Sequence, residues 1–92
     1  MHLVGKGILS GLKGRNPEVD TWVSAWTAEL EHAIWANQAE LIDQFPSVRE
    51  KSAGIFIFDV GLAKCWLEVR IVFPQKIARI VAILGAEEID GH

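Results

Sequence analysis

Residues 56 to 73 read FIFDVGLAKCWLEVRIVF, and this stretch decides the fold. Two runs rich in β-branched, aromatic and aliphatic residues flank the turn-forming residues GLAK at positions 61–64. Such runs on either side of a short turn are typical of paired strands. A third run, at 77–84, follows a second turn signal, PQK. We therefore predict three strands, at 55–60, 65–73 and 77–84, joined by short connections as an antiparallel meander.

The middle run predicts a sheet with two different faces, because side chains alternate across a strand. The core set is Cys65, Leu67, Val69, Ile71 and Phe73, and the opposite set is Trp66, Glu68, Arg70 and Val72. If residues 73–76 form the connection, the expected opposed pairs are Val72 with Ile77, Arg70 with Arg79, Glu68 with Val81, and Trp66 with Ile83. Arg70 and Arg79 are thus expected side by side, with Glu68 diagonal to Arg79 and able to relieve their repulsion.

Two helices are predicted before the strands. Asn16 is a good N-cap and Pro17 suits the first helical position, so a helix is expected to begin there. Its apolar stripe is expected to be core and consists of Val19, Trp22, Val23, Trp26, Leu30, Ala33 and Ile34. Asn37 and Glu40 resemble a capping box that begins a second, shorter helix, which Pro46 ends.

The first fourteen residues predict less regular structure. MHLV suits a short edge strand, and the glycines of GKGILSGLKG make this segment a poor helix. The expected fold is one α+β domain over residues 1–92. Two to three N-terminal helices pack on one face of a small antiparallel sheet, which consists of the short N-terminal strand and the three-stranded meander.

Composition argues against several kinds of site. The single cysteine, Cys65, has no disulfide partner and is expected to be inert in the core. The three histidines, His2, His32 and His92, lack zinc-ligand spacing, and the glycines near the N-terminus fit no phosphate-loop pattern. We expect no metal and no cofactor.

The chain is expected to be soluble and cytoplasmic, with no membrane partner. Its N-terminus lacks the pattern of a signal peptide, and no stretch reaches the length of an apolar membrane span. Nine basic against twelve acidic side chains give a net charge of −3. Because this charge offers no general attraction to phosphate polymers, any nucleic-acid role needs a local basic patch.

The expected arginine pair supports two interpretations. One is a solvated surface with a small ion cluster, which contributes roughly 0–1 kcal/mol. The other is an anion-binding patch in which Trp66 stacks on a nucleobase, a contact typically of about 1–3 kcal/mol.

The whole chain resembles the HigB-type toxins of bacterial toxin–antitoxin modules, within the RelE-like superfamily. The resemblance runs through MHLVGKGIL, the tryptophan-bearing helix with AIW, the segment FPSV, the strand FIFDVG and the closing AEEID, in the family's order. It implies the RelE-like fold. It also implies an mRNA interferase, an endoribonuclease that cuts messenger RNA in the ribosome with the help of cationic and proton-transferring side chains.

The family's active-site positions fall on different chemistry in this chain. The family's hairpin arginine, last-strand arginine, histidine and tyrosine correspond to Trp66, Val81, Ala86 and Ile89, whereas the family's Glu and Asp correspond to Glu88 and Asp90. Since Trp, Val, Ala and Ile neither carry charge nor move a proton, we predict a pseudo-toxin without appreciable cleavage.

The predicted function is therefore protein binding through Trp66, Val81 and Ile83, with a HigA-type antitoxin or a second copy as partner. One rival is a working ribosome-dependent endoribonuclease, in which Lys64, Arg70 and Arg79 hold RNA phosphate and Trp66 stacks on a base. Another is a structural module with an unknown ligand.

Overall fold

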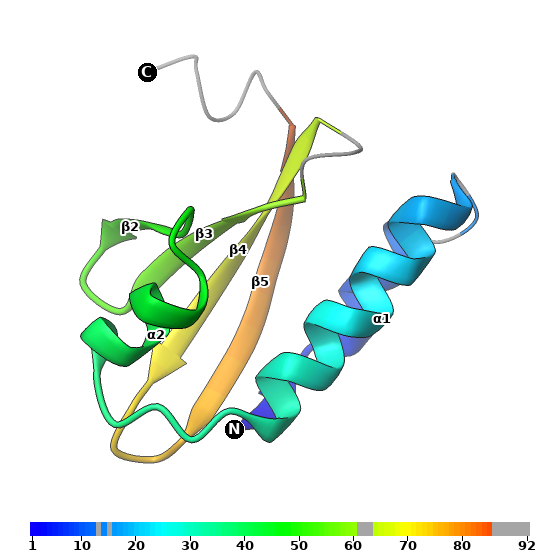
Figure 1. The fold of residues 1–92 in the computed structure, drawn as a ribbon. Coiled ribbons are helices and arrows are strands. Elements are labelled where there is room, and N and C mark those ends of the chain that lie inside the picture. The colour runs from blue at the N-terminus through cyan, green and yellow to red at the C-terminus, as the bar shows by residue number, and fades with distance from the viewer. Residues whose placement is uncertain (13, 15, 61–63, 86–92) are drawn as a thin grey trace.

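The computed structural model of the 92-residue chain describes residues 1–12, 14, 16–60 and 64–85. The helices are η1 (Lys6–Gly11, a 3-10 helix), α1 (Pro17–His32) and α2 (Gln38–Gln44). The strands are β1 (His2–Val4), β2 (Arg49–Ser52), β3 (Ile55–Asp59), β4 (Cys65–Val72) and β5 (Ile77–Gly85). They form one sheet in the order β1-β5-β4-β3-β2 (Figure 1). The predicted α+β class is confirmed.

The sheet is mixed and not purely antiparallel as predicted. The β3–β4–β5 meander is antiparallel, but β1 pairs with β5 in parallel. A fifth strand, β2, lies at the far edge beside β3, in a segment outside the predicted strands. Its sequence, REKS, is exposed throughout, so it lacks the apolar alternation that would have predicted a strand.

The register of the β4–β5 hairpin agrees with the prediction near the turn and departs from it farther away. Val72 lies opposite Ile77 and Arg70 opposite Arg79, as expected. A β-bulge follows: Val69 pairs with Ile80 but Glu68 pairs with Ala82, which leaves Val81 as the extra residue of β5. The expected pairs of Glu68 with Val81 and of Trp66 with Ile83 are therefore wrong.

The bulge has a consequence for packing. Beyond it, Ile83 lies opposite Leu67, on the core face, where Ile83 packs partly buried against the core. Trp66 instead lies opposite Leu84. Without the extra residue, Ile83 would face away from the core, because a one-residue shift turns every following side chain to the other face.

Helix α1 begins as predicted and ends earlier than its apolar stripe. The side chain of Asn16 accepts a hydrogen bond from the backbone N–H of Glu18 at 2.8 Å. Ala33 has an extended backbone with ψ of 144°, so the helix ends at His32. Ala33 is still buried, but Ile34 is 80% exposed and is not core as predicted, because it no longer follows the helical phase.

Helix α2 is capped as its sequence indicates. The side chain of Asn37 accepts from the backbone N–H of Glu40 at 3.1 Å, and the Glu40 carboxylate accepts from the backbone N–H of Ala36 at 3.0 Å. These bonds satisfy backbone donors that the first helical turn leaves without partners. No helix within the described ranges has the length and apolar character needed to cross a bilayer.

An ion pair joins η1 to α1 and gives a testable prediction. Lys6 Nζ donates a hydrogen bond to Glu31 Oε2 at 2.9 Å. This hydrogen bond, and then the Lys6 charge, hold the pKa of Glu31 below its usual value. Because the pKa is lowered in the folded state, the small stabilisation is present at neutral pH and is lost as the pH falls through the folded pKa. Lys6→Gln is expected to raise the pKa of Glu31, measured by NMR titration of the side-chain carboxyl carbon.

Lys51→Gln is the matched control, because it breaks a different exposed ion pair at 3.0 Å, with Glu68. It should leave the Glu31 titration unchanged. A Glu31 pKa that does not respond to Lys6→Gln would show that the ion pair does not persist in solution.

Candidate functional site

The core packs on one face of the sheet, and the candidate site lies on the opposite face. Trp26 of α1 meets Phe58 of β3 with ring centroids 5.4 Å apart, and Phe45, which ends α2, meets the same ring at 5.2 Å. Both helices therefore pack on the face that holds Phe58. The opposite side is called the outer face here. Its side chains, assigned from the strand register, include Val4, Ile55, Ile57, Trp66, Glu68, Arg70, Val72, Ile77, Arg79, Ala82 and Leu84.

The centre of the candidate site is the arginine pair. Arg70 of β4 and Arg79 of β5 lie directly opposite each other, and both are exposed. With Val4, Val72 and Ile77 they line a hollow of about 440 Å³. An adjoining hollow of about 470 Å³ is lined by both arginines with Val4, Gly5, Ile8, Ile80 and Val81. The two guanidinium groups are thus set in mostly apolar surroundings.

No carboxylate among the described residues forms an ion pair with either arginine. Glu68 was expected to relieve their repulsion, but the bulge places it opposite Ala82 and it does not pair with Arg79. Its carboxylate instead accepts a hydrogen bond from Lys51 of β2 at 3.0 Å. The arginine pair is therefore a local concentration of positive charge on a chain whose net charge is −3.

Trp66 lies too far from the two arginines to form one site with them. Arg70 is four positions after Trp66 along β4, which at about 3.4 Å per residue places their Cα atoms roughly 14 Å apart. Glu68 projects from the same face between them. The structure therefore does not bring Trp66 beside the arginine pair, and its neighbours in register are Asp59 and Leu84.

The other predicted site residues are scattered. Val81 is 42% exposed at the bulge, beside the arginine hollow, whereas Ile83 lies on the core face. Lys64 is exposed before β4, with a left-handed φ of 50°. The predicted positions Ala86, Glu88, Ile89 and Asp90 lie outside the described residues.

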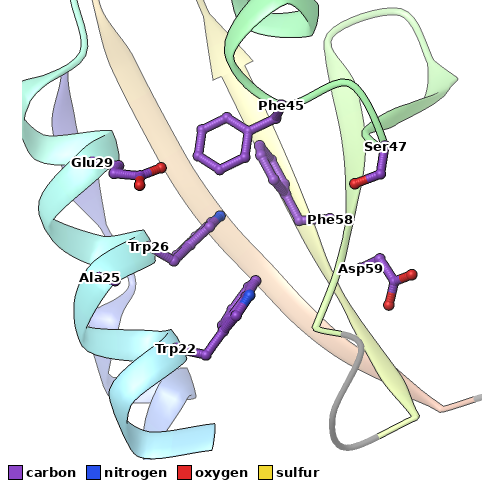
Figure 2. A pocket seen from close by; sticks show the side chains of 8 residues that line it. All are labelled: Trp22, Ala25, Trp26, Glu29, Phe45, Ser47, Phe58 and Asp59. Atoms are coloured by element: carbon purple, nitrogen blue, oxygen red, sulfur yellow. The ribbon is translucent and has the colours of Figure 1, made fainter. Parts of the chain in front are cut away.

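Sequence reasoning missed a further hollow, on the helix-covered side of the sheet. Figure 2 shows it between α1 and the segment that leads from α2 to β3. Its volume is about 220 Å³, and its lining residues are Trp22, Ala25, Trp26, Glu29, Phe45, Ser47, Phe58 and Asp59. The tryptophans were correctly predicted to pack in or against the core. Their spacing gave no sign of a hollow, because three separate segments form it.

The described residues offer little for acid–base or metal chemistry. They contain no group of three or more His, Cys, Asp and Glu side chains that could hold a metal ion. Cys65 is buried, where a thiol is poorly reactive. What the outer face does offer is two hydrogen-bonding cations in an apolar frame, which suits binding of an anionic group.

No protein-family model matches this chain, and no curated protein matches it significantly. The resemblance to HigB-type toxins thus rests on the sequence motifs alone.

Proposed function

We propose that this chain is a HigB-like protein of the RelE-like superfamily that acts by binding a HigA-type antitoxin through its outer face. Arg70 and Arg79 receive carboxylates of the partner, and Val4, Val72 and Val81 contact its apolar side chains. The observation that carries the proposal is the opposed arginine pair, which has no carboxylate partner among the described residues. The α+β class of the structure is compatible with the fold that the resemblance implies.

The energetics favour an external anion. Like charges directly opposite each other across two strands destabilise the sheet, so this pair does not serve stability. A guanidinium group binds a carboxylate through two parallel hydrogen bonds, and one carboxylate-bearing segment would relieve the repulsion. Arginines within an apolar patch are also typical of the residues that dominate protein–protein binding energy.

The described part of the outer face lacks what RNA cleavage needs. Attack of the 2′-oxygen on the adjacent phosphorus needs a base to take the hydroxyl proton, and departure of the 5′-oxygen needs an acid to protonate it. Glu68 is the nearest carboxylate on β4, and its side chain is engaged by Lys51. Trp66 and Val81, which correspond to the family's two arginines, supply neither charge nor protons. Binding without chemistry is therefore the function that this surface supports best.

The test is calorimetric titration of the purified chain against the antitoxin-type protein encoded beside it. Arg70→Ala and Arg79→Ala are each expected to weaken binding about 10- to 100-fold, because a hydrogen bond to a charged group contributes about 1.5–3 kcal/mol. Arg49→Ala is the matched control, since Arg49 is an exposed arginine of the same sheet on the distant strand β2. It should bind as the unchanged chain does.

If the chain does not bind the antitoxin-type protein at micromolar concentration, the proposal is overturned. If the neighbouring gene does not encode an antitoxin, a structural module is favoured. Equal losses from Arg49→Ala and Arg79→Ala would show that general charge attracts the partner. Self-association that Arg79→Ala abolishes would make a second copy the partner.

The second candidate is the ribosome-dependent endoribonuclease, and the same arginine pair favours it because guanidinium groups also bind phosphate bidentately. In that function Arg70, Arg79 and Lys64 hold the RNA backbone. Growth arrest on induction, with messenger RNA fragments that disappear with Arg79→Ala, would establish this function in place of partner binding.

A further inference from the structure

The hollow beside α1 is lined by aromatic rings, and it is called the aromatic hollow here. The Trp22 and Trp26 rings stack with centroids 6.0 Å apart and an interplanar angle of 11°. Phe58 meets the Trp26 ring and the Phe45 ring at angles of 77° and 85°. In Figure 2 these rings project from α1, from the end of α2 and from β3 toward a common space. The hollow therefore has aromatic walls from three segments.

The aromatic hollow contains an unused hydrogen-bond donor. Trp26 is 2% exposed, and its indole N–H meets no acceptor among the described residues. Figure 2 shows this nitrogen directed away from α1 into the space in front of Phe45 and Phe58. An aromatic ring is at best a weak acceptor for it. By contrast, the buried Trp35 donates its indole N–H to Gln44 Oε1 at 3.0 Å.

A carboxylate borders the same hollow. Glu29, one turn after Trp26 on α1, lines it, and Figure 2 shows its side chain directed from α1 toward the rings. Asp59, at the end of β3, also lines it, but it lies opposite Trp66 in register and its side chain points away from the rings. Glu29 is exposed and forms no ion pair among the described residues. Negative charge beside aromatic faces selects a cation, and a planar guanidinium group stacks on indole better than an ammonium group does.

We propose that the aromatic hollow binds an arginine side chain of a partner polypeptide. The guanidinium group lies on the Trp22 ring and pairs with Glu29, while a backbone carbonyl of the same segment accepts from the Trp26 indole N–H. The indole nitrogen is closed to solvent, so the carbonyl reaches it only after a lining side chain moves. This site lies on the opposite face of the sheet from Arg70 and Arg79, so it goes beyond the proposed function. Either the aromatic hollow or the arginine pair can fail its test without affecting the other.

The test follows the indole N–H resonance of Trp26 by NMR while blocked arginine, acetyl-arginine-amide, is titrated into the full chain. A saturable downfield shift is expected, because the proton gains a carbonyl acceptor. Acetyl-citrulline-amide has the same shape without the charge and should bind at least several-fold more weakly. Citrulline binding as tightly as arginine, or no saturable shift with arginine, would overturn the proposal.

Three variants assign the contacts. Glu29→Gln is expected to weaken arginine binding about two- to fivefold, as for an exposed ion pair. Glu18→Gln, on the first turn of α1, removes the same charge away from the hollow and should have no effect. Trp26→Phe keeps an aromatic ring but removes the donor, and should weaken binding by several-fold, followed through the Trp22 indole resonance. Equal effects of Glu29→Gln and Glu18→Gln would show that overall charge attracts arginine to the chain. They would contradict the proposed site.

Discussion

Replacing Phe58 with alanine is expected to lower the free energy of unfolding by about 3–5 kcal/mol. Phe58 is 2% exposed and lies at the centre of a chain of aromatic contacts that joins three parts of the fold. It meets Trp26 of α1 at 5.4 Å and Phe45 at 5.2 Å, and Phe45 in turn meets Trp35 at 5.9 Å. Removing the central ring leaves a cavity and loses edge-to-face contacts to both helices. Urea denaturation followed by tryptophan fluorescence measures the change.

The matched control is Ile34→Ala, which removes an aliphatic side chain that the sequence places in the helical stripe but that is 80% exposed. It should change stability by no more than about 0.5 kcal/mol. Small domains often have only about 5–15 kcal/mol of stability, so Phe58→Ala can leave little folded protein. Phe58→Leu then serves instead, with a smaller loss in the same direction. Equal stabilities of the Phe58 and Ile34 variants would mean that the aromatic contacts do not hold the helices to the sheet.

The parts of the fold that sequence predicts well are those decided by neighbouring residues. Asn16 and Asn37 cap helices because a side-chain oxygen within three residues of the free backbone N–H groups can satisfy them. Arg70 and Arg79 lie opposite each other because only a short turn separates them, and a short turn fixes the register on either side. The centre of the candidate site was therefore predictable.

The parts that sequence misses are decided by distant packing. The bulge at Val81 turns Ile83 toward the core, and nothing in IVAILG marks which residue is the extra one. The parallel pairing of β1 with β5 joins the two ends of the described chain, and the polar strand β2 has no apolar pattern. The aromatic hollow combines three segments, so the unused N–H of Trp26 shows only when the fold is in view.

The bulge also links the fold to the proposed function. The bulge places Glu68 opposite Ala82, its carboxylate pairs with Lys51, and no carboxylate among the described residues pairs with the two arginines. A regular strand would have placed Val81 opposite Glu68, with Glu68 diagonal to Arg79. In the proposed function, the two arginines beside this bulge are the groups that bind the partner.

Gly5→Ala is expected to destabilise the protein by about 2–5 kcal/mol, through two effects at one atom. Gly5 joins β1 to η1 with φ of 86°, in the left-handed region, where a residue with a Cβ is strained by about 1–2 kcal/mol. An added Cβ would also lie 2.7 Å from the backbone oxygen of Ile80 in β5. A backbone oxygen within a strand cannot turn aside as a flexible side chain can, so β1 must move away from β5. Urea denaturation measures the loss.

Gly7→Ala is the matched control, because Gly7 lies two residues later in η1 and an added Cβ there meets no atom within 4 Å. It should change stability by about 0.5 kcal/mol or less. Gly5 also lines the hollow that holds both arginines, and Val4 pairs with Arg79, so displacement of β1 should weaken partner binding as well. Equal unfolding midpoints for the two variants would show that β1 is not held against β5 in solution. The proposed site would then lose one of its walls.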